Sequence, residues 1–284
     1  MGGRRAAVAG GIRRKGFTLA EMSMVLVVAG VVMMIVFPAL SYVRVSAQRS
    51  LTESNLQSLL RAAAVYVQVN GCLPCPTPAG VSGAGFGRVR GDTGTAACGG
   101  CAQAEGIAPF VSLGVPQSTA RDGWGRWITM RIDPALAVNF GVAPPTSPCT
   151  AADVTAGICA QEKMSQKGLC RQSLSAANRI NVQTPGGPVQ QAAVIFVSHG
   201  ANGHGSFVAG AISNGLNGER LPFPGGSLGC ASGVAEKCNA DGDVNFVNAP
   251  HAVGGTNPFD DSLAFMDRNN LVSMLGNGSC HTVW

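Results

Sequence analysis

Cysteine is the residue type in this sequence with the clearest chemistry, and the chain contains 10 of them. An even number of cysteines in a loop-rich chain favours disulfide bonds if the chain is exported, as its N-terminal segment predicts below. The sequence does not fix their pairing, although short separations favour Cys149–Cys159 and Cys230–Cys238. The disulfide candidates are Cys72, Cys75, Cys98, Cys101, Cys149, Cys159, Cys170, Cys230, Cys238 and Cys280.

Two C-x-x-C motifs offer a second interpretation of four of these thiols. The motifs are Cys72/Cys75 and Cys98/Cys101, and two such pairs can hold a structural zinc ion. The gap between them is longer than the roughly 15–20 residues usual for zinc sites. We therefore expect disulfides here and keep zinc as the alternative. A redox role is not expected, because no thioredoxin-like βαβ pattern surrounds either motif.

Oxygen-bearing side chains alternate along residues 239–245 (NADGDVN). Such spacing can bind calcium through Asp241 and Asp243, with Asp260 or Asp261 as further ligands. The EF-hand pattern fails, since Phe246 stands where that loop needs glycine. A polar turn before a strand is the alternative interpretation, and no other cofactor is expected.

Ser198 and His199 end the strongest strand candidate and raise the question of hydrolysis. Neighbouring residues of a strand point to opposite faces, which separates the two side chains. Ser198 does not lie in a G-x-S-x-G elbow, and the sequence contains no P-loop and no H-E-x-x-H motif. Glycines and Asn202 follow, so a turn is expected rather than an active site. We expect no enzyme.

Glu21 stands at the start of an apolar stretch, since residues 22–43 contain no charged side chain. That stretch is long enough to cross a bilayer core of about 30 Å as a helix. Five basic residues and no acid precede it within residues 1–16, which should keep the N-terminus in the cytoplasm and export the rest. A carboxylate at this depth is costly and therefore suggests a function. An ordinary signal anchor is the alternative.

The run Lys15-Gly16-Phe17-Thr18-Leu19-Ala20-Glu21 resembles the leader junction of type IV prepilins and type II secretion pseudopilins. The resemblance implies that prepilin peptidase removes residues 1–16, cutting between Gly16 and Phe17. It also implies that the new amine of Phe17 is methylated. Glu21 matches the family's assembly residue, which could pair with a neighbour's Phe17 amine as helices pack side by side.

This resemblance implies a structural subunit of a type IV pilus or a type II secretion pseudopilus. The large exported part favours a minor subunit, and a major pilin is the alternative. An anchored periplasmic enzyme or metal-binding domain is a third interpretation. The implied partners are prepilin peptidase, other pilin or pseudopilin subunits and the assembly platform of the bacterial inner membrane. The implied location is that membrane, with a periplasmic head, and then the filament.

Nucleic acid is not an expected partner, although the net charge is +5. Five of the 20 basic residues lie in the leader, so the rest of the chain has 15 basic and 15 acidic residues. A DNA-binding surface needs clustered lysine and arginine on the folded body. The composition, with 46% hydrophobic and 12% charged residues, also excludes a disordered chain.

The candidate residues named above must be positioned by one long helix and a sheet. Residues 17–69 are expected to be helical: 17–43 form an apolar transmembrane and assembly half, and helically spaced apolar residues after 44 pack on the head. The expected fold of 44–284 is α+β and pilin-like, with an antiparallel sheet packed on the helix and long disulfide-rich loops. Strands are expected at 126–132, 179–182, 192–198, 244–247 and 263–266, and a short helix at 269–275.

Overall fold

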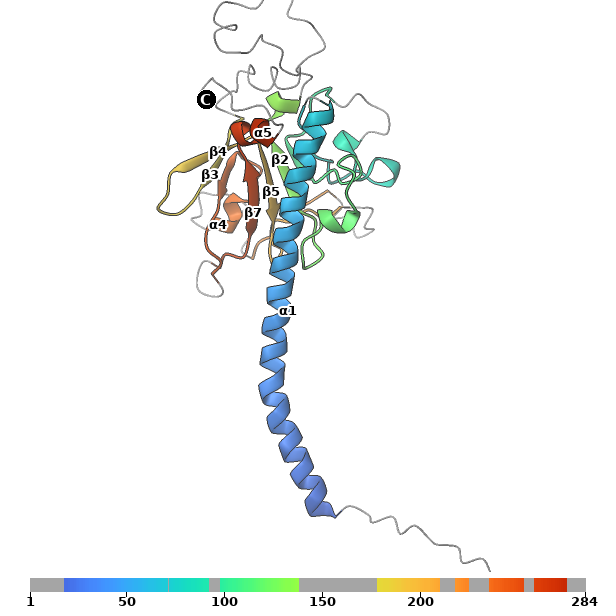
Figure 1. Ribbon diagram of the computed structural model, residues 1–284, viewed down its shortest axis with the longest axis vertical. Coiled ribbons are helices and arrows are strands. Elements are labelled where there is room, and N and C mark those ends of the chain that lie inside the picture. The colour runs from blue at the N-terminus through green and yellow to red at the C-terminus, as the bar shows by residue number, and fades with distance from the viewer. Residues whose placement is uncertain are drawn as a thin grey trace, which may run out of the picture. The chain divides into compact units, whose positions relative to one another are not determined.

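The computed structural model describes residues 18–70, 72–91, 98–137, 178–209, 218–224, 235–252 and 258–274, and the description below concerns these residues. The chain divides into two compact units, Met1–Ala47 and Gln48–Trp284, each described by itself. The secondary structure is α+β, with an N-terminal helix and an antiparallel sheet (Figure 1). The predicted fold class is confirmed at that level.

Helix α1 runs from Leu19 to Asn70, within two residues of the predicted bounds. It continues through Pro38, so the proline does not end it. Its second part contributes a buried stripe to the core of the larger unit. The helically spaced apolar residues predicted to pack on the head include Leu56, Leu59, Leu60, Ala63 and Val67, and all five are buried.

A four-stranded antiparallel sheet forms the centre of the larger unit, in the order β1-β2-β5-β7. Strand β5 is buried along its whole length. Its Val194 and Phe196 belong to the same core cluster as the buried stripe of α1, whereas Ile195 and Val197 belong to a second cluster. The strands of this four-stranded sheet are β1 (Glu105–Ile107), β2 (Thr129–Ile132), β5 (Val194–Ser198) and β7 (Ser262–Met266).

A second sheet has the order β4-β3-β6 and covers the second core cluster. Its strands are β3 (Ile180–Gln183), β4 (Val189–Ala192) and β6 (Asn245–Val247). Strands β3 and β4 pair antiparallel, but β3 and β6 pair parallel. The prediction of one antiparallel sheet is therefore incomplete, because a second sheet is present and its strands β3 and β6 run parallel.

Short helical elements complete the described structure. Helix α4 (Ala235–Cys238) was not predicted, and helix α5 (Arg268–Met274) lies within one residue of the predicted helix 269–275. Four 3₁₀ turns occupy Gly83–Gly85, Val89–Gly91, Gln117–Ala120 and Pro134–Ala137.

Loops hold α1 through its polar side chains as well as its apolar stripe. The Thr52 hydroxyl accepts a hydrogen bond of 2.9 Å from the backbone N–H of Gly123. The Asn55 amide donates to the carbonyl oxygens of Ser118 and Arg121 at 3.2 and 2.8 Å. These contacts fix the loop before β2 against the helix, which helps to position that strand.

Candidate functional site

The proposed cleavage point, Gly16 and Phe17, lies outside the described residues, which begin at Thr18. Glu21 lies in the first turn of α1 and is exposed. Its carboxylate accepts hydrogen bonds from the backbone N–H of Thr18 at 2.8 Å and from the Thr18 hydroxyl at 3.0 Å. The backbone N–H of Glu21 in turn donates to the Thr18 hydroxyl oxygen at 3.3 Å.

Thr18 and Glu21 therefore form a capping box, in which N-cap and N3 side chains satisfy backbone donors reciprocally. This role was not predicted, although the T-x-x-E spacing that signals it is present at residues 18–21. Glu21 has a local explanation as a helix cap. Any role in assembly must be separated from it by experiment.

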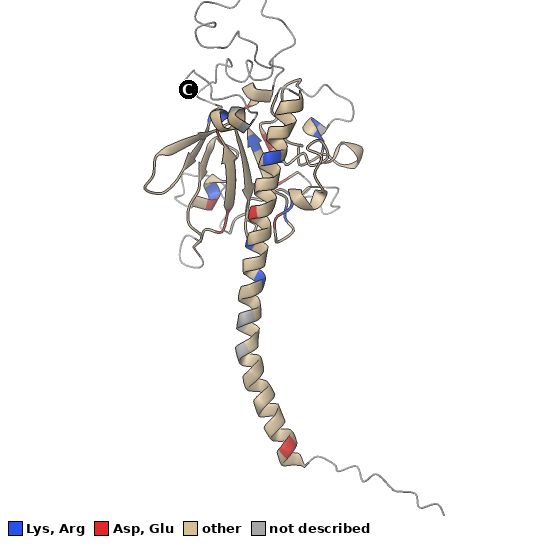
Figure 2. Ribbon diagram, in the orientation of Figure 1, with Lys and Arg blue, Asp and Glu red and all other residues tan. Residues whose placement is uncertain are grey.

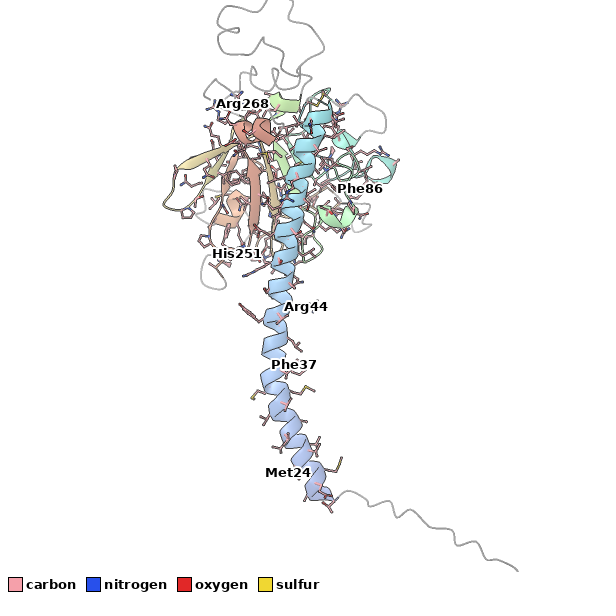
Figure 3. All side chains as sticks on the ribbon, in the orientation of Figure 1. Met24, Phe37, Arg44, Phe86, His251 and Arg268 are labelled. Carbon is pink, nitrogen blue, oxygen red and sulfur yellow. A yellow bond between two sulfur atoms is a disulfide. The ribbon has the colours of Figure 1, made fainter. Side chains whose placement is uncertain are left out.

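The helix that follows Glu21 has an apolar and exposed surface. Residues 22–43 contain no charged side chain, in line with the mostly tan helix of Figure 2, and Figure 3 shows Met24 and Phe37 projecting from it. Met24 is 72% exposed and Phe37 is 62% exposed. Within the described residues, no helix combines the length and apolar character that crossing a membrane requires. The prediction of a transmembrane segment over 17–43 thus gains no support from them.

Four of the predicted disulfide cysteines pair crosswise between the two C-x-x-C motifs. Cys72 bonds to Cys98 and Cys75 to Cys101, each across a sequence separation of 26. Their sulfurs are consumed in these bonds, so none is present as a thiolate to bind zinc. Cys238 is also disulfide-bonded. The other five predicted candidates, Cys149, Cys159, Cys170, Cys230 and Cys280, lie outside the described residues.

Asp241, which is half-buried, and Asp243, which is exposed, lie in a turn before β6. The Asp241 carboxylate accepts from the backbone N–H of Asp243 at 3.1 Å, and the Asp243 carboxylate accepts from that of Asn245 at 2.6 Å. Arg131 donates to the carbonyl oxygen of Gly242 at 2.8 Å. The negative charges of both aspartates oppose the lowering of the Arg131 pKa, which burial causes. These contacts account for the oxygen-rich run as a turn beside a cation.

Ser198 and His199 are both buried but make separate contacts. The Ser198 hydroxyl donates to the Asp122 carboxylate at 2.8 Å, whereas His199 Nε2 lies 2.9 Å from the Thr129 hydroxyl oxygen. The predicted turn follows, with Gly200 at φ 58° and its Cα close to Asp260. The arrangement lacks the serine–histidine hydrogen bond that nucleophilic catalysis requires.

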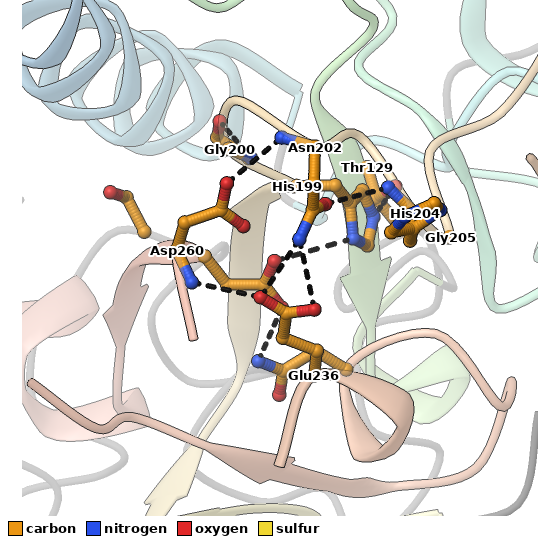
Figure 4. A network of polar contacts seen from close by, with 12 residues as sticks. Thr129, His199, Gly200, Asn202, His204, Gly205, Glu236 and Asp260 are labelled. Atoms are coloured by element: carbon orange, nitrogen blue, oxygen red, sulfur yellow. Dashed lines mark hydrogen bonds and ion pairs between the residues drawn. The ribbon is translucent and has the colours of Figure 1, made fainter. Parts of the chain in front are cut away.

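Three carboxylates gather beside this turn, from Glu236, Asp260 and Asp261 (Figure 4). Glu236 belongs to α4, and the two aspartates directly precede β7. Asn202, in the turn after β5, donates from its amide to Glu236 at 3.0 Å and from its backbone N–H to Asp260 at 2.9 Å. The turn and α4 are thus joined to the start of β7 by one polar network.

Burial dominates the electrostatics of this network. It raises the pKa of Asp261 well above its usual value, and it raises that of Glu236 to about 7 with help from neighbouring Asp260. Burial also lowers the pKa of His199 to about 3, so its imidazole is neutral. Asp260 and Asp261 were predicted as possible ligands, whereas His199 was considered only with Ser198 and Glu236 was not predicted, because no fixed spacing links either residue to the aspartates.

Comparison with known proteins returned no matching family model, no matching curated protein and no matching solved structure.

Proposed function

We propose that this chain is a structural subunit of a type IV pilus or a type II secretion pseudopilus, acting as a minor component of the filament. Prepilin peptidase removes residues 1–16 at the bacterial inner membrane, and α1 then docks beside the helices of other subunits on the assembly platform. The observation that carries the proposal is the exposed, uncharged stretch after Glu21, which follows a leader rich in basic residues.

The exposed side chains of that stretch need a covering partner. Met34, for example, is 79% exposed. Covering such a side chain with apolar surface removes it from water, which is favourable. Similar helices from neighbouring subunits supply such surface along their whole length. Glu21 is the one acid in this part of α1, and a positive Phe17 amine on a neighbour gives it a partner once the helices pack.

The capping box supplies a matched pair of variants for the test. Glu21→Gln removes the charge but keeps a side chain that can complete the box, because glutamine also serves at the N3 position. Thr18→Val removes the hydroxyl that completes the box but keeps the carboxylate. Both leave the Gly16–Phe17 bond unchanged, so both are expected to be processed.

The measurement compares processed protein in membranes with protein in sheared filaments or cross-linked to other pilins. If the charge pairs with a neighbour, Glu21→Gln should lower incorporation by about tenfold or more, as losing one strong polar contact does. Thr18→Val should change it far less. Equal losses in both variants would show that Glu21 acts as a helix cap, and normal incorporation of Glu21→Gln would refute the charge pair.

A further inference from the structure

Among the residues that the structure describes, three buried polar atoms of the network in Figure 4 have no hydrogen-bond partner. They are Asp260 Oδ1, Asp261 Oδ1 and His199 Nδ1. A buried polar atom without a partner costs free energy, so such atoms require an explanation. Asp261 Oδ1 and His199 Nδ1 lie 4.0 Å apart beside the carboxylates of Glu236 and Asp260, so a cation bound there would give these atoms a partner.

The remaining atoms of the same side chains are held in place. Asp260 Oδ2 accepts from the backbone N–H of Asn202 at 2.9 Å, and Asp261 Oδ2 accepts from the Asn239 amide at 2.8 Å. His199 Nε2 lies 2.9 Å from the Thr129 hydroxyl. Outer contacts of this kind orient metal ligands and fix which ring nitrogen of a histidine is available. Here they leave one oxygen of each aspartate and Nδ1 of His199 for a further partner.

The spacing of the ligand atoms fits a single ion. One carboxylate oxygen each from Glu236, Asp260 and Asp261 lies within 4.8 Å of the other two. Ligands on opposite sides of a divalent cation lie about 4–5 Å apart, given bond lengths of about 2.0–2.6 Å. His199 Nδ1 lies 4.0 Å from Asp261 Oδ1, and the exposed fraction of both side chains is 0%. The imidazole therefore borders the carboxylates from within the core.

The charges point the same way. The Glu236, Asp260 and Asp261 carboxylates lie together, and negative charges this close repel one another unless a cation compensates them. Arg220 is near enough to lower the pKa of Asp261 slightly, but its guanidinium pairs with Glu105. Arg126 donates to the carbonyl oxygens of Gly200 and Ala201 and so holds the turn. A bound dication would neutralise the carboxylates directly.

We propose that Glu236, Asp260, Asp261 and His199 form a binding site for a divalent metal ion that accepts three carboxylates and one imidazole nitrogen. Mn²⁺ and Zn²⁺ suit this mixed set, whereas Ca²⁺ prefers oxygen ligands alone. The ion would tie α4 and the turn after β5 to the start of β7. This proposal does not depend on the filament function.

The test uses the purified mature protein after chelation and dialysis, with Zn²⁺, Mn²⁺ or Ca²⁺ added separately. Calorimetry measures binding, and thermal unfolding measures stability. At an ion concentration about a hundredfold above Kd, the unfolding temperature should rise by about 5–10 °C with Zn²⁺ or Mn²⁺. Failure of all three ions to bind would overturn the proposal.

Three variants locate the ion. Asp261→Asn keeps the size of the side chain and removes one buried charge, so it should fold without metal at least as stably as the wild type, yet lose the metal-dependent shift. His199→Gln should weaken Zn²⁺ or Mn²⁺ binding by at least about tenfold. Asp243→Asn, in the exposed turn before β6, should bind as the wild type does. Loss of binding in Asp243→Asn alone would place the ion at the Asp241–Asp243 turn and overturn the proposal.

Discussion

At the scale of single residues, Gly123 shows how closely a loop can approach a helix. Its backbone N–H donates to Thr52, and its Cα lies directly against the backbone of Gln48. A Cβ atom built at this position would overlap the carbonyl oxygen of Gln48, which is backbone and cannot rotate away. Gly123 is therefore required by space rather than by a positive φ angle.

Gly123→Ala should lower the free energy of unfolding by about 1–3 kcal/mol, the usual cost of forcing extra atoms into a packed contact. The Thr52 hydrogen bond should weaken as the loop moves away from α1. Gly187→Ala is the control, because a Cβ there meets its nearest atom at an ordinary 3.5 Å. Urea unfolding of both variants measures the difference, and equal stability would contradict the steric argument.

Residue roles differed in how far the sequence could reveal them. The capping box was readable, because Thr18 and Glu21 have a fixed local spacing. The carboxylate network was not, since Glu236 and Asp260 come from separate elements and meet through tertiary structure. The paired aspartates at 260 and 261 were a partial signal. His199 was noticed for its neighbour Ser198, yet its unpartnered Nδ1 atom faces Asp261 instead.

At the scale of elements, strong periodicity was predictive and short elements were not. The spacing of Leu56 to Val67 predicted the buried stripe of α1, and the apolar run at 192–198 predicted the central strand β5. Strand β1 was missed because its three residues, Glu105–Ile107, contain a charge and a glycine. Strand β4 was missed because Val189 and Gln190 are exposed and carry no apolar alternation.

The two described disulfides staple the segment after α1 to the segment before β1. Because Cys72–Cys98 and Cys75–Cys101 cross between neighbouring motifs, either one leaves only a ring of about eight residues for the other to close. Chain-entropy arithmetic then gives about 2.5 kcal/mol for losing one bond and about 6 kcal/mol for losing both.

Urea unfolding of the Cys75→Ala/Cys101→Ala variant and of the variant lacking all four cysteines should therefore show unequal steps. The first removal should cost less free energy of unfolding than the second. The Cys72→Ala/Cys98→Ala variant is the matched control and should resemble the other single-bridge protein. Equal, additive steps of about 3.5 kcal/mol each would mean that the bridges act as independent loops.

At the scale of the whole molecule, the two units differ in whether their apolar side chains are buried or exposed. The unit Gln48–Trp284 buries its own core between α1 residues and the sheet. The unit Met1–Ala47 contains a helical stretch whose large apolar side chains are exposed. A chain with this division has one part that is stable by internal packing and another that needs an external partner.

The proposed maturation would change the distribution of charge along the chain. Residues 1–16 contain five basic residues and no acidic residue. Removing this segment leaves 15 basic and 15 acidic residues in the rest of the chain. Processing between Gly16 and Phe17 should therefore shift the isoelectric point from about 8.8 toward neutrality. It should also place a free amine one residue before Thr18, at the positive end of the helix dipole, where a neighbour's Glu21 would compensate it.

Mass spectrometry of protein recovered from filaments should find Phe17 as the first residue, carrying one added methyl group. Gly16→Val is the control, since a branched side chain at the scissile bond should block cleavage while leaving α1 unchanged. That variant should keep Met1 and its basic leader, and it should be absent from filaments, because no Phe17 amine is released to pair with Glu21. Wild-type filaments whose subunits retain Met1 would refute maturation at this bond, and with it the proposed role of the amine in docking.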